Sequence, residues 1–272
     1  MAQASQASVP CHPPLYPALS SAAATMATDA PGAEAEGIEA KMRRVHWVPL
    51  ESNPDVLNDF ATKVGLPGGY EFVDVYGVDE ELLCMVPSPC LAVTLLFGSS
   101  DNLREAKRTQ REQIEASGQK VSSELVYLKQ YIGNACGTIA CVHSIANNAE
   151  AMGVPADSAI ARFLGATKGK SPQEAGAALA DAAELHCASE ASAQGGQTAA
   201  PEATASVDAH FICFVEKDGD VYELDGNKAF PINHGASGGD LMKATAQVIK
   251  KSFMDKDPEN IRFNMMALVK QE

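Results

Sequence analysis

The chain has 272 residues, enough for one large domain or two modest ones, and 46% of them are hydrophobic, as in an ordinary globular protein. Its formal net charge of -14 argues against non-specific nucleic-acid binding and favours a basic partner. No apolar run approaches the roughly 20 residues that cross a bilayer, so no membrane role is expected. The seven cysteines are odd in number and match no zinc spacing. We therefore expect that the chain binds no metal and that its thiols are free. Free thiols indicate a reducing compartment, and we expect the cytoplasm, with the nucleus as a second location.

Residues 1–42 differ in composition from the rest of the chain. They are rich in Ala, Ser and Pro, and end in an acidic run of small residues at 29–40. Such a segment cannot bury enough apolar surface to offset its chain entropy, so we expect a disordered extension before a folded domain at 43–272. An organelle transit peptide is the alternative, but transit peptides are rich in Arg and poor in acidic residues.

The first part of the folded domain is expected to alternate helices and strands. A helix is predicted from Asp55 to Val64, with Asn53 as the N-cap and Pro54 at the first helical position. The run CLAVTLLF is wholly apolar and predicts a buried central strand. In chain order, the pattern predicts a strand at 71–76, a helical turn at 79–85, that central strand at 90–97 and a charged, solvated helix at 101–118.

The segment QYIGNACGTIACVHSIANN, residues 130–148, carries the first candidate for chemistry. Apolar residues at helical spacing predict a buried helix from about residue 135, with Asn134 as its N-cap. Cys136 then lies in the first turn, where unpaired N–H groups and the helix dipole stabilise a thiolate. A small cysteine that merely packs is the alternative. His143 lies about 10 Å further along the axis and is expected to be a packing histidine.

Two helices, at 157–164 and 171–185, are expected before a long loop at about 187–207. The loop has almost no large apolar residue and contains the pair Gly195-Gly196. A structureless segment of this length inside a compact domain is usually functional or disordered. We interpret it as a gate near the active site, and a plain linker is the alternative.

A β-hairpin is predicted around Asp218-Gly219, because alternating apolar runs flank this strong signal for a two-residue turn. In that register His210 and Asp225 are diagonal neighbours within side-chain reach. A His–Asp pair that only caps a sheet edge is the alternative. With Cys136, however, the pair completes a nucleophile, a base and a group that orients the base. The opposite face of the hairpin, expected to be its buried one, carries Phe211, Cys213, Val215, Tyr222 and Leu224.

The end of the chain completes an α/β fold. A helix is predicted at 240–254 and a last strand at 261–268. The predicted strands are 72–76, 90–97, 211–216, 221–225 and 262–268, with helices between and around them. This content and order predict an α/β fold of the α+β type.

Several sequence motifs of the domain occur in the same order along the chain as in one known enzyme family. They are VPLESNPDVLNDF, EFVDVYGVDEELLCMVP, QYIGNACGT, IANN, DAHFICFV, VYELDG, FPINHG and DPENIRFNMMAL. From about Val45 to the C-terminus the chain thus resembles the small, single-domain ubiquitin carboxyl-terminal hydrolases, a family of cysteine proteases. The resemblance implies a central antiparallel sheet flanked by helices, a papain-like arrangement of the catalytic residues and a knotted backbone, with no cofactor.

The resemblance also implies a role for individual residues. Cys136 is the nucleophile, His210 is the general base and proton donor, Asp225 orients His210, and Gln130 donates to the oxyanion. The loop at 187–207 becomes a crossover loop past which leaving groups must thread. Substrate contacts are expected at Pro49, Leu50, Glu51, Ser52, Asn53, Pro54, Asp55, Asp74, Ala193, Gln194, Gly195, Gly196, Gln197, Thr198, Ala199, Ala200, Asn260 and Ile261.

The function implied is that of a monomeric thiol hydrolase, which cleaves small adducts or short peptide tails from the C-terminal glycine of ubiquitin. Its intermediate is an acyl-enzyme on Cys136. Two alternatives stay open: the same chemistry directed at the neddylation modifier, and a ubiquitin-binding protein with little turnover. A pure binder has no need of Gln130 or Asp225, so the complete set of residues favours an enzyme.

Overall fold

The structure is a computed structural model, and it describes residues 45–271. The predicted disordered extension, 1–42, lies outside the described residues. The helices are α2 (Pro54–Val64), α3 (Glu80–Leu83), α4 (Asp101–Ser117), α5 (Cys136–Ala146), α6 (Ala149–Met152), α7 (Ala159–Thr167), α8 (Pro172–Ala178), α9 (Ala183–Ala193) and α10 (Leu241–Ser252), with short 3-10 turns at η1 (Leu179–Asp181) and η2 (Met254–Lys256). The strands are β1 (Tyr70–Val75), β2 (Cys90–Gly98), β3 (Ala209–Lys217), β4 (Asp220–Leu224), β5 (Ile232–Ala236) and β6 (Phe263–Lys270).

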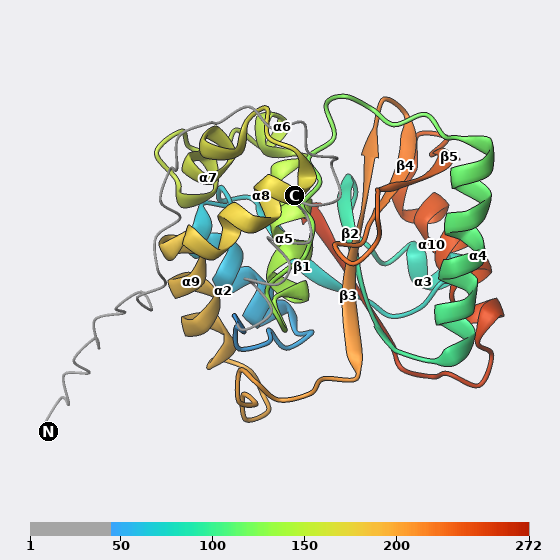
Figure 1. Cartoon of the computed structure of the whole chain (residues 1–272), viewed down its shortest axis with the longest axis horizontal. Coiled ribbons are helices and arrows are strands. Elements are labelled where there is room, and N and C mark those ends of the chain that lie inside the picture. Colours follow the sequence, from blue (N-terminus) through green and yellow to red (C-terminus); the bar gives the residue numbers. More distant parts are fainter. Residues whose placement is uncertain (1–44, 272) are drawn as a thin grey trace, which may run out of the picture.

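The six strands form one sheet in the order β1-β6-β2-β3-β4-β5, and every neighbouring pair is antiparallel. Figure 1 shows this sheet in the middle of the molecule with helices on both sides. The expected α+β fold with a central antiparallel sheet is therefore confirmed. The strand β5 was not predicted, because its sequence INHGA lacks the apolar alternation of a half-buried strand.

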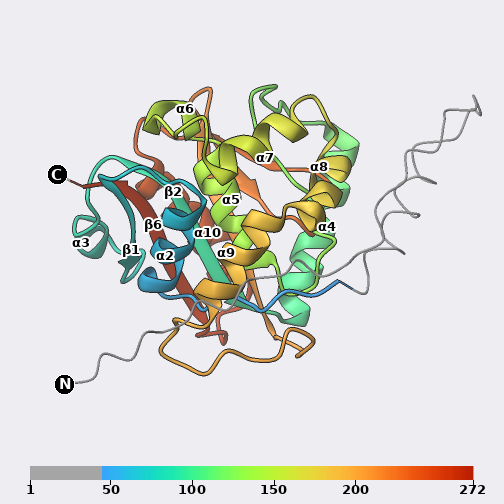
Figure 2. The same ribbon diagram turned by 90° about the vertical axis from the view of Figure 1, so that its left-hand side faces the viewer.

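Both faces of the sheet are buried. Helices α2, α5, α7, α8 and α9 contribute to the core on one face, and α3 and α10 to the core on the other (Figures 1 and 2). The prediction that only one face of the β3–β4 hairpin is buried is wrong, since Ile212 and Phe214 on its other face are fully buried. The reason lies in α10, whose apolar stripe, including Met242, Ala246 and Ile249, covers that face.

Most predicted elements agree with the structure to within a few residues. Asn53 caps α2, with Pro54 at its first position, and Ser171 forms a capping box with Glu174 at the start of α8. The single helix predicted at 171–185 is wrong, because the backbone of Ala182, with ψ 73°, breaks it before α9. Helix α9 then continues to residue 193, so the crossover loop spans 194–208 rather than 187–207.

The expectation of free thiols holds only in part. Cys84, Cys90, Cys136, Cys141 and Cys213 are free, whereas Cys187 is disulfide-bonded. Among residues 45–271, no helix combines the length and apolarity that a membrane crossing requires. The same residues contain no group of three or more His, Cys, Asp and Glu side chains placed to hold a metal ion.

Candidate active site

Cys136 is the first residue of α5, a helix that lies almost entirely inside the protein. Its surroundings are tight, since a Cβ added to Gly137 would lie only 3.2 Å from Leu50 and 3.3 Å from the ring of Phe211. The prediction that Asn134 caps the helix is wrong. The N-cap is the following alanine, without a side-chain cap bond, and Asn134 adopts a left-handed backbone with φ 60°. The N–H groups of the first turn are thus not consumed by a capping side chain, and can act on the sulfur or on an oxyanion.

His210 and Asp225 come from the start of β3 and the residue after β4. The hairpin has the predicted register, and its turn is Asp218-Gly219. His210 Nε2 lies 2.7 Å from Oδ1 of Asp225, which is completely buried. His210 also interacts with the thiol of Cys136, and this interaction lowers the pKa of the thiol and raises that of the imidazole. Because Nε2 faces Asp225, Nδ1 is the ring atom left for the thiol.

The electrostatics of these three groups favour separated charges. Burial alone would raise the pKa of Cys136, but the hydrogen bond to His210, the charge of that imidazole and two backbone N–H groups outweigh it and lower the pKa. Burial would lower the pKa of His210, whereas the charge of Asp225 and the bonds to Asp225 and Cys136 raise it to about 9. Burial also opposes ionisation of Asp225, but His210 and neighbouring lysines hold its pKa well below the ordinary value. Both shifts have the direction that favours a pair of thiolate and imidazolium.

Gln130 lies on the extended segment that leads to α5. Its backbone N–H donates to Gly226 O at 2.9 Å, and a Cβ added to Gly226 would lie 2.9 Å from the Gln130 Cβ, so only glycine permits this approach. The side-chain Nε2 donates to Ile132 O at 3.1 Å, while Oε1 is buried without a partner. An amide nitrogen has two hydrogens, so one remains for an oxyanion. The oxyanion role of Gln130 stays a prediction.

A narrow pocket of about 220 Å³ opens at Cys136. Its wall includes seven of the expected substrate residues: Pro49, Leu50, Glu51, Ser52, Ala193, Thr198 and Ala200. The rest of the wall, which was not predicted, is formed by Leu96, Gly137, Pro201, Val207, Ala209 and Phe211. No local pattern distinguishes these residues from ordinary core and loop positions, because only the fold brings them to the thiol.

The crossover loop, 194–208, is tied to Glu51 at the edge of this pocket. Glu51 accepts hydrogen bonds from Thr198 Oγ1 at 2.6 Å, Thr198 N at 3.0 Å and Gln197 N at 3.3 Å. Chiefly because of the Thr198 hydroxyl, the pKa of Glu51 lies below its ordinary value. Gly196 passes so close that an added Cβ would lie 2.5 Å from the carboxylate. Glu51 thus anchors the loop, a role that the sequence did not suggest.

Asn134 holds the same loop further along. Its Nδ2 donates to Ala203 O at 2.8 Å and to Ala205 O at 2.9 Å. Asparagine tolerates the left-handed backbone of this position better than most residues do. Together with the bonds to Glu51, these contacts fasten the loop near both of its ends.

The other expected substrate residues do not line the pocket. Asp74 lies on the edge strand β1. Asn260 donates to Gly98 O at 3.1 Å, and Ile261 is 90% exposed. The remaining ones are Asn53, Pro54, Asp55, Gln194, Gly195, Gly196, Gln197 and Ala199. Their contacts with a bound protein stay predictions.

Three hydrogen-bond partners of Asp225 were not predicted from the sequence. The N–H of Asn227 donates to Oδ1 at 2.9 Å, the Tyr127 hydroxyl donates to the backbone carbonyl at 2.7 Å, and Lys107 Nζ donates to Oδ2 at 2.7 Å. The sequence Asp-Gly-Asn is a signal for the first of these, since an Asp side chain commonly accepts the N–H two residues on. Nothing in the charged helix around Lys107 distinguishes it from its neighbours.

His143 is the packing histidine that its spacing predicts. It is completely buried, and its Nε2 accepts the N–H of Leu128 at 2.9 Å. Burial lowers the pKa of His143 to about 3, so its ring is neutral.

This geometry is that of a cysteine hydrolase in which a carboxylate-bound imidazole activates a thiol at a helix start. The family "Ubiquitin carboxyl-terminal hydrolase, family 1" matches residues 47–254. The chain is 44% identical to a probable ubiquitin carboxyl-terminal hydrolase of Dictyostelium discoideum, over 83% of this chain and 89% of that one. It is 37% identical to the human ubiquitin carboxyl-terminal hydrolase isozyme L1, over 82% and 97% of the two chains. The protein therefore belongs to the ubiquitin carboxyl-terminal hydrolases, and it is a cysteine-type deubiquitinating enzyme.

A solved structure shares the fold. The catalytic domain of UCH37 from Trichinella spiralis, bound to ubiquitin vinyl methyl ester, superimposes with a TM-score of 0.65 and 20% identity. The match covers 85% of this chain and 98% of that one. This chain thus shares the fold of that catalytic domain, and the comparison at this identity concerns the fold alone.

Proposed function

We propose that this protein hydrolyses small adducts and short peptide tails from the C-terminal glycine of ubiquitin, through an acyl-enzyme on Cys136. The observation that carries the proposal is the assembled Cys136–His210–Asp225 arrangement beside a narrow pocket under a tethered loop. Ubiquitin as the partner is supported by the names of the relatives and by the related structure with ubiquitin vinyl methyl ester.

The mechanism follows from the charges of the three groups. The Cys136 thiolate attacks the glycine carbonyl carbon, and the electron pair moves to the oxygen, where the Cys136 N–H and the Gln130 amide donate to it. Collapse of this intermediate expels the leaving amine, which takes a proton from His210. Water then attacks the thioester while His210 accepts its proton. The thiolate leaves beside the protonated His210, which restores the ion pair, and the product carboxylic acid loses its proton to water.

The crossover loop limits the leaving group. Its bonds to Glu51 and Asn134 hold it over a pocket of about 220 Å³. A folded leaving domain has to pass this loop, whereas an amine or a disordered tail does not. We expect small adducts to be cleaved well and folded fusions poorly. Insertion of about ten Gly and Ser residues after Ala199 should raise the rate for a folded fusion more than the rate for a small amide.

The direct test is hydrolysis of a fluorogenic amide of the ubiquitin C-terminus by the wild type and by Cys136→Ala, with binding of free ubiquitin measured for both. Turnover that disappears in Cys136→Ala while binding remains would support the proposal. Tight binding without turnover in the wild type would leave a ubiquitin-holding protein instead.

The same assay separates two modifiers. The tails of ubiquitin and of the neddylation modifier are both basic and end in Gly-Gly, so the narrow pocket alone does not distinguish them. Amides of the two proteins compared at equal concentration decide which is preferred. We propose ubiquitin, and a higher kcat/KM for the neddylation modifier would reverse the assignment.

A further inference from the structure

Asp225 has a partner that reaches it from outside the hairpin. Its Oδ1 is shared by His210 Nε2 and the N–H of Asn227, at 2.7 and 2.9 Å. Its Oδ2 accepts a hydrogen bond from Lys107 Nζ of α4 at 2.7 Å. The carboxylate is completely buried, whereas 29% of the Lys107 side chain is exposed. The lysine therefore extends inward from the surface to the catalytic acid.

Lys107 differs from the other cations of α4. The others pair with acids on the exposed surface of the same helix: Arg104 with Asp101, Arg108 with Glu105 and Glu112, and Arg111 with Glu115. Lys107 Nζ instead lies 5.0 Å from the ring centroid of Phe97, and that ring meets the His210 ring edge-on at 5.9 Å. The ammonium group is thus held against both the carboxylate and an aromatic side chain that contacts the catalytic imidazole.

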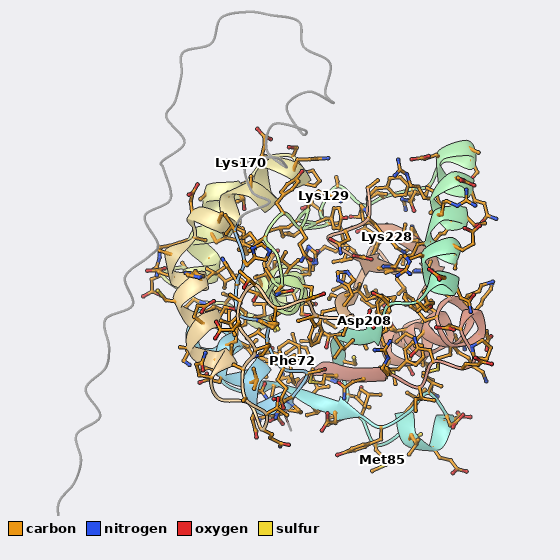
Figure 3. All side chains as sticks on the ribbon, turned by 60° about the horizontal axis from the view of Figure 1, so that its bottom comes forward. Phe72, Met85, Lys129, Lys170, Asp208 and Lys228 are labelled. Carbon is orange, nitrogen blue, oxygen red and sulfur yellow. The ribbon has the colours of Figure 1, made fainter. Side chains whose placement is uncertain are left out.

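The face of α4 toward the sheet is polar. Leu103 is the one fully buried side chain of this helix. Gln110 accepts a hydrogen bond from Lys228 Nζ at 2.7 Å, and Figure 3 shows Lys228 between the middle of the molecule and α4. A cavity of about 730 Å³ lies between α4, β4 and α10, and Lys107 forms part of its wall. Polar contacts, rather than a packed apolar stripe, therefore join the middle of α4 to the catalytic acid.

We propose that Lys107 is a positioning residue of the catalytic centre, which fixes Oδ2 of Asp225 so that Oδ1 stays aimed at His210. This rests on the function proposed above, since it concerns the same site. A buried carboxylate is costly unless it is paired. After His210 gives its proton to the leaving amine, the neutral ring no longer offsets the charge of Asp225. Lys107 supplies the counter-charge during that interval, until water returns a proton to His210.

A pH profile can detect this role. The other titratable groups that face Asp225 are His210, Lys228, Tyr127 and His143, with Glu223 nearby on β4. Burial raises the pKa of Tyr127 far above neutrality and lowers that of His143 to about 3, so neither changes charge near pH 7. Lys228 is engaged by Glu223. Loss of Lys107 removes a positive charge from the carboxylate that holds His210, so the pKa of His210 should rise. Because His210 must be neutral to accept the proton of water, the acidic limb of kcat should move to higher pH.

The experiment compares Lys107→Met and Lys107→Arg with Arg111→Met, which removes a cation from the exposed side of the same helix. We expect Lys107→Met to lower kcat on the ubiquitin amide by about 10- to 100-fold, as misplaced catalytic groups do, with KM within about twofold. The acidic limb should shift upward. Lys107→Arg should recover most of kcat, and Arg111→Met should match the wild type. Thermal unfolding of each variant reports on folding, and Lys107→Gln replaces Lys107→Met if the latter does not fold.

The cavity offers a second readout. In Lys107→Ala, ethylammonium ions can enter beside the lost ammonium group, so kcat should rise with ethylammonium and not with equal sodium chloride. A neutral variant with wild-type kcat and pH profile would overturn the proposal. A loss that neither Lys107→Arg nor ethylammonium reduces would also overturn it. Both results differ from failure of the proposed function, in which the wild type itself shows no turnover that depends on Cys136.

Discussion

The substitution Asp225→Asn tests how the site holds its charges. Asp225 is completely buried, and His210 Nε2 lies 2.7 Å from it. Although burial opposes ionisation, the pKa of His210 is raised from 6.5 to about 9, and the charge of Asp225 is the largest cause of that rise. Since each factor of ten corresponds to 1.36 kcal/mol, the protein stabilises the imidazolium by about 3 kcal/mol relative to an ordinary histidine.

In Asp225→Asn this charge is lost while the burial remains. The pKa of His210 should therefore fall to about 6.5 or below, and the pKa of Cys136 should rise because its cationic partner is lost. The basic limb of kcat/KM should move from about pH 9 to below about pH 7. At pH 7.5 a His210 pKa of about 6.5 leaves about one imidazole in ten protonated, so we expect a loss of about tenfold, and more if the pKa falls further.

The assay is kcat/KM on the fluorogenic ubiquitin amide from pH 5 to about 10, with the rate of thiol alkylation by iodoacetamide as an independent report of the thiolate. Asp218→Asn is the matched control, because it removes the same charge from the turn of the same hairpin at a backbone position that Asn accepts. A basic limb that stays near pH 9 in Asp225→Asn would refute the electrostatic reasoning.

Three further predictions concern the loop, the oxyanion segment and the buried ion pairs. Glu51→Gln weakens the bonds to the crossover loop, so the rate for a folded ubiquitin fusion should rise several-fold while that for a small amide changes little. In Gly226→Ala the added methyl group displaces Gln130, so kcat should fall about 10- to 100-fold and the free energy of unfolding by about 1–3 kcal/mol. The control is Gly165→Ala on α7, where the added methyl group meets open space and should not destabilise the protein. The pKa of Glu223 is lowered to about 2, so the stability that it contributes is complete above pH 4.5 and is lost as pH falls toward about 2. Glu223→Gln should lower the free energy of unfolding in urea at pH 7 by about 3–5 kcal/mol and flatten its dependence on pH in that range.

Local signals in the sequence predicted the elements that carry the chemistry. The Asp218-Gly219 turn determined the hairpin register, and the register placed His210 beside Asp225 as observed. The helix that begins with Cys136 follows from apolar spacing, although its cap was assigned wrongly to Asn134. Both signals depend on residues close together in sequence, which is why they can be interpreted without a structure.

The contacts that escaped prediction join residues far apart in sequence. Glu51 meets Thr198 across 147 positions, and Lys107 meets Asp225 across 118. Each of these side chains has an ordinary alternative as a surface residue, so composition and spacing do not single it out. The second buried face of the hairpin was missed for the same reason, since α10, which covers it, follows both strands in the chain.

The central claim is that the Cys136 thiolate is the nucleophile toward ubiquitin's C-terminus. The most direct test is reaction of the full chain with ubiquitin vinyl methyl ester at pH 7.5, followed by intact-mass measurement and mapping of the modified peptide. The structure predicts a single ubiquitin adduct on Cys136, slowed strongly in Asp225→Asn and absent in Cys136→Ala. An adduct on another cysteine, or one that persists in Cys136→Ala, would contradict the account.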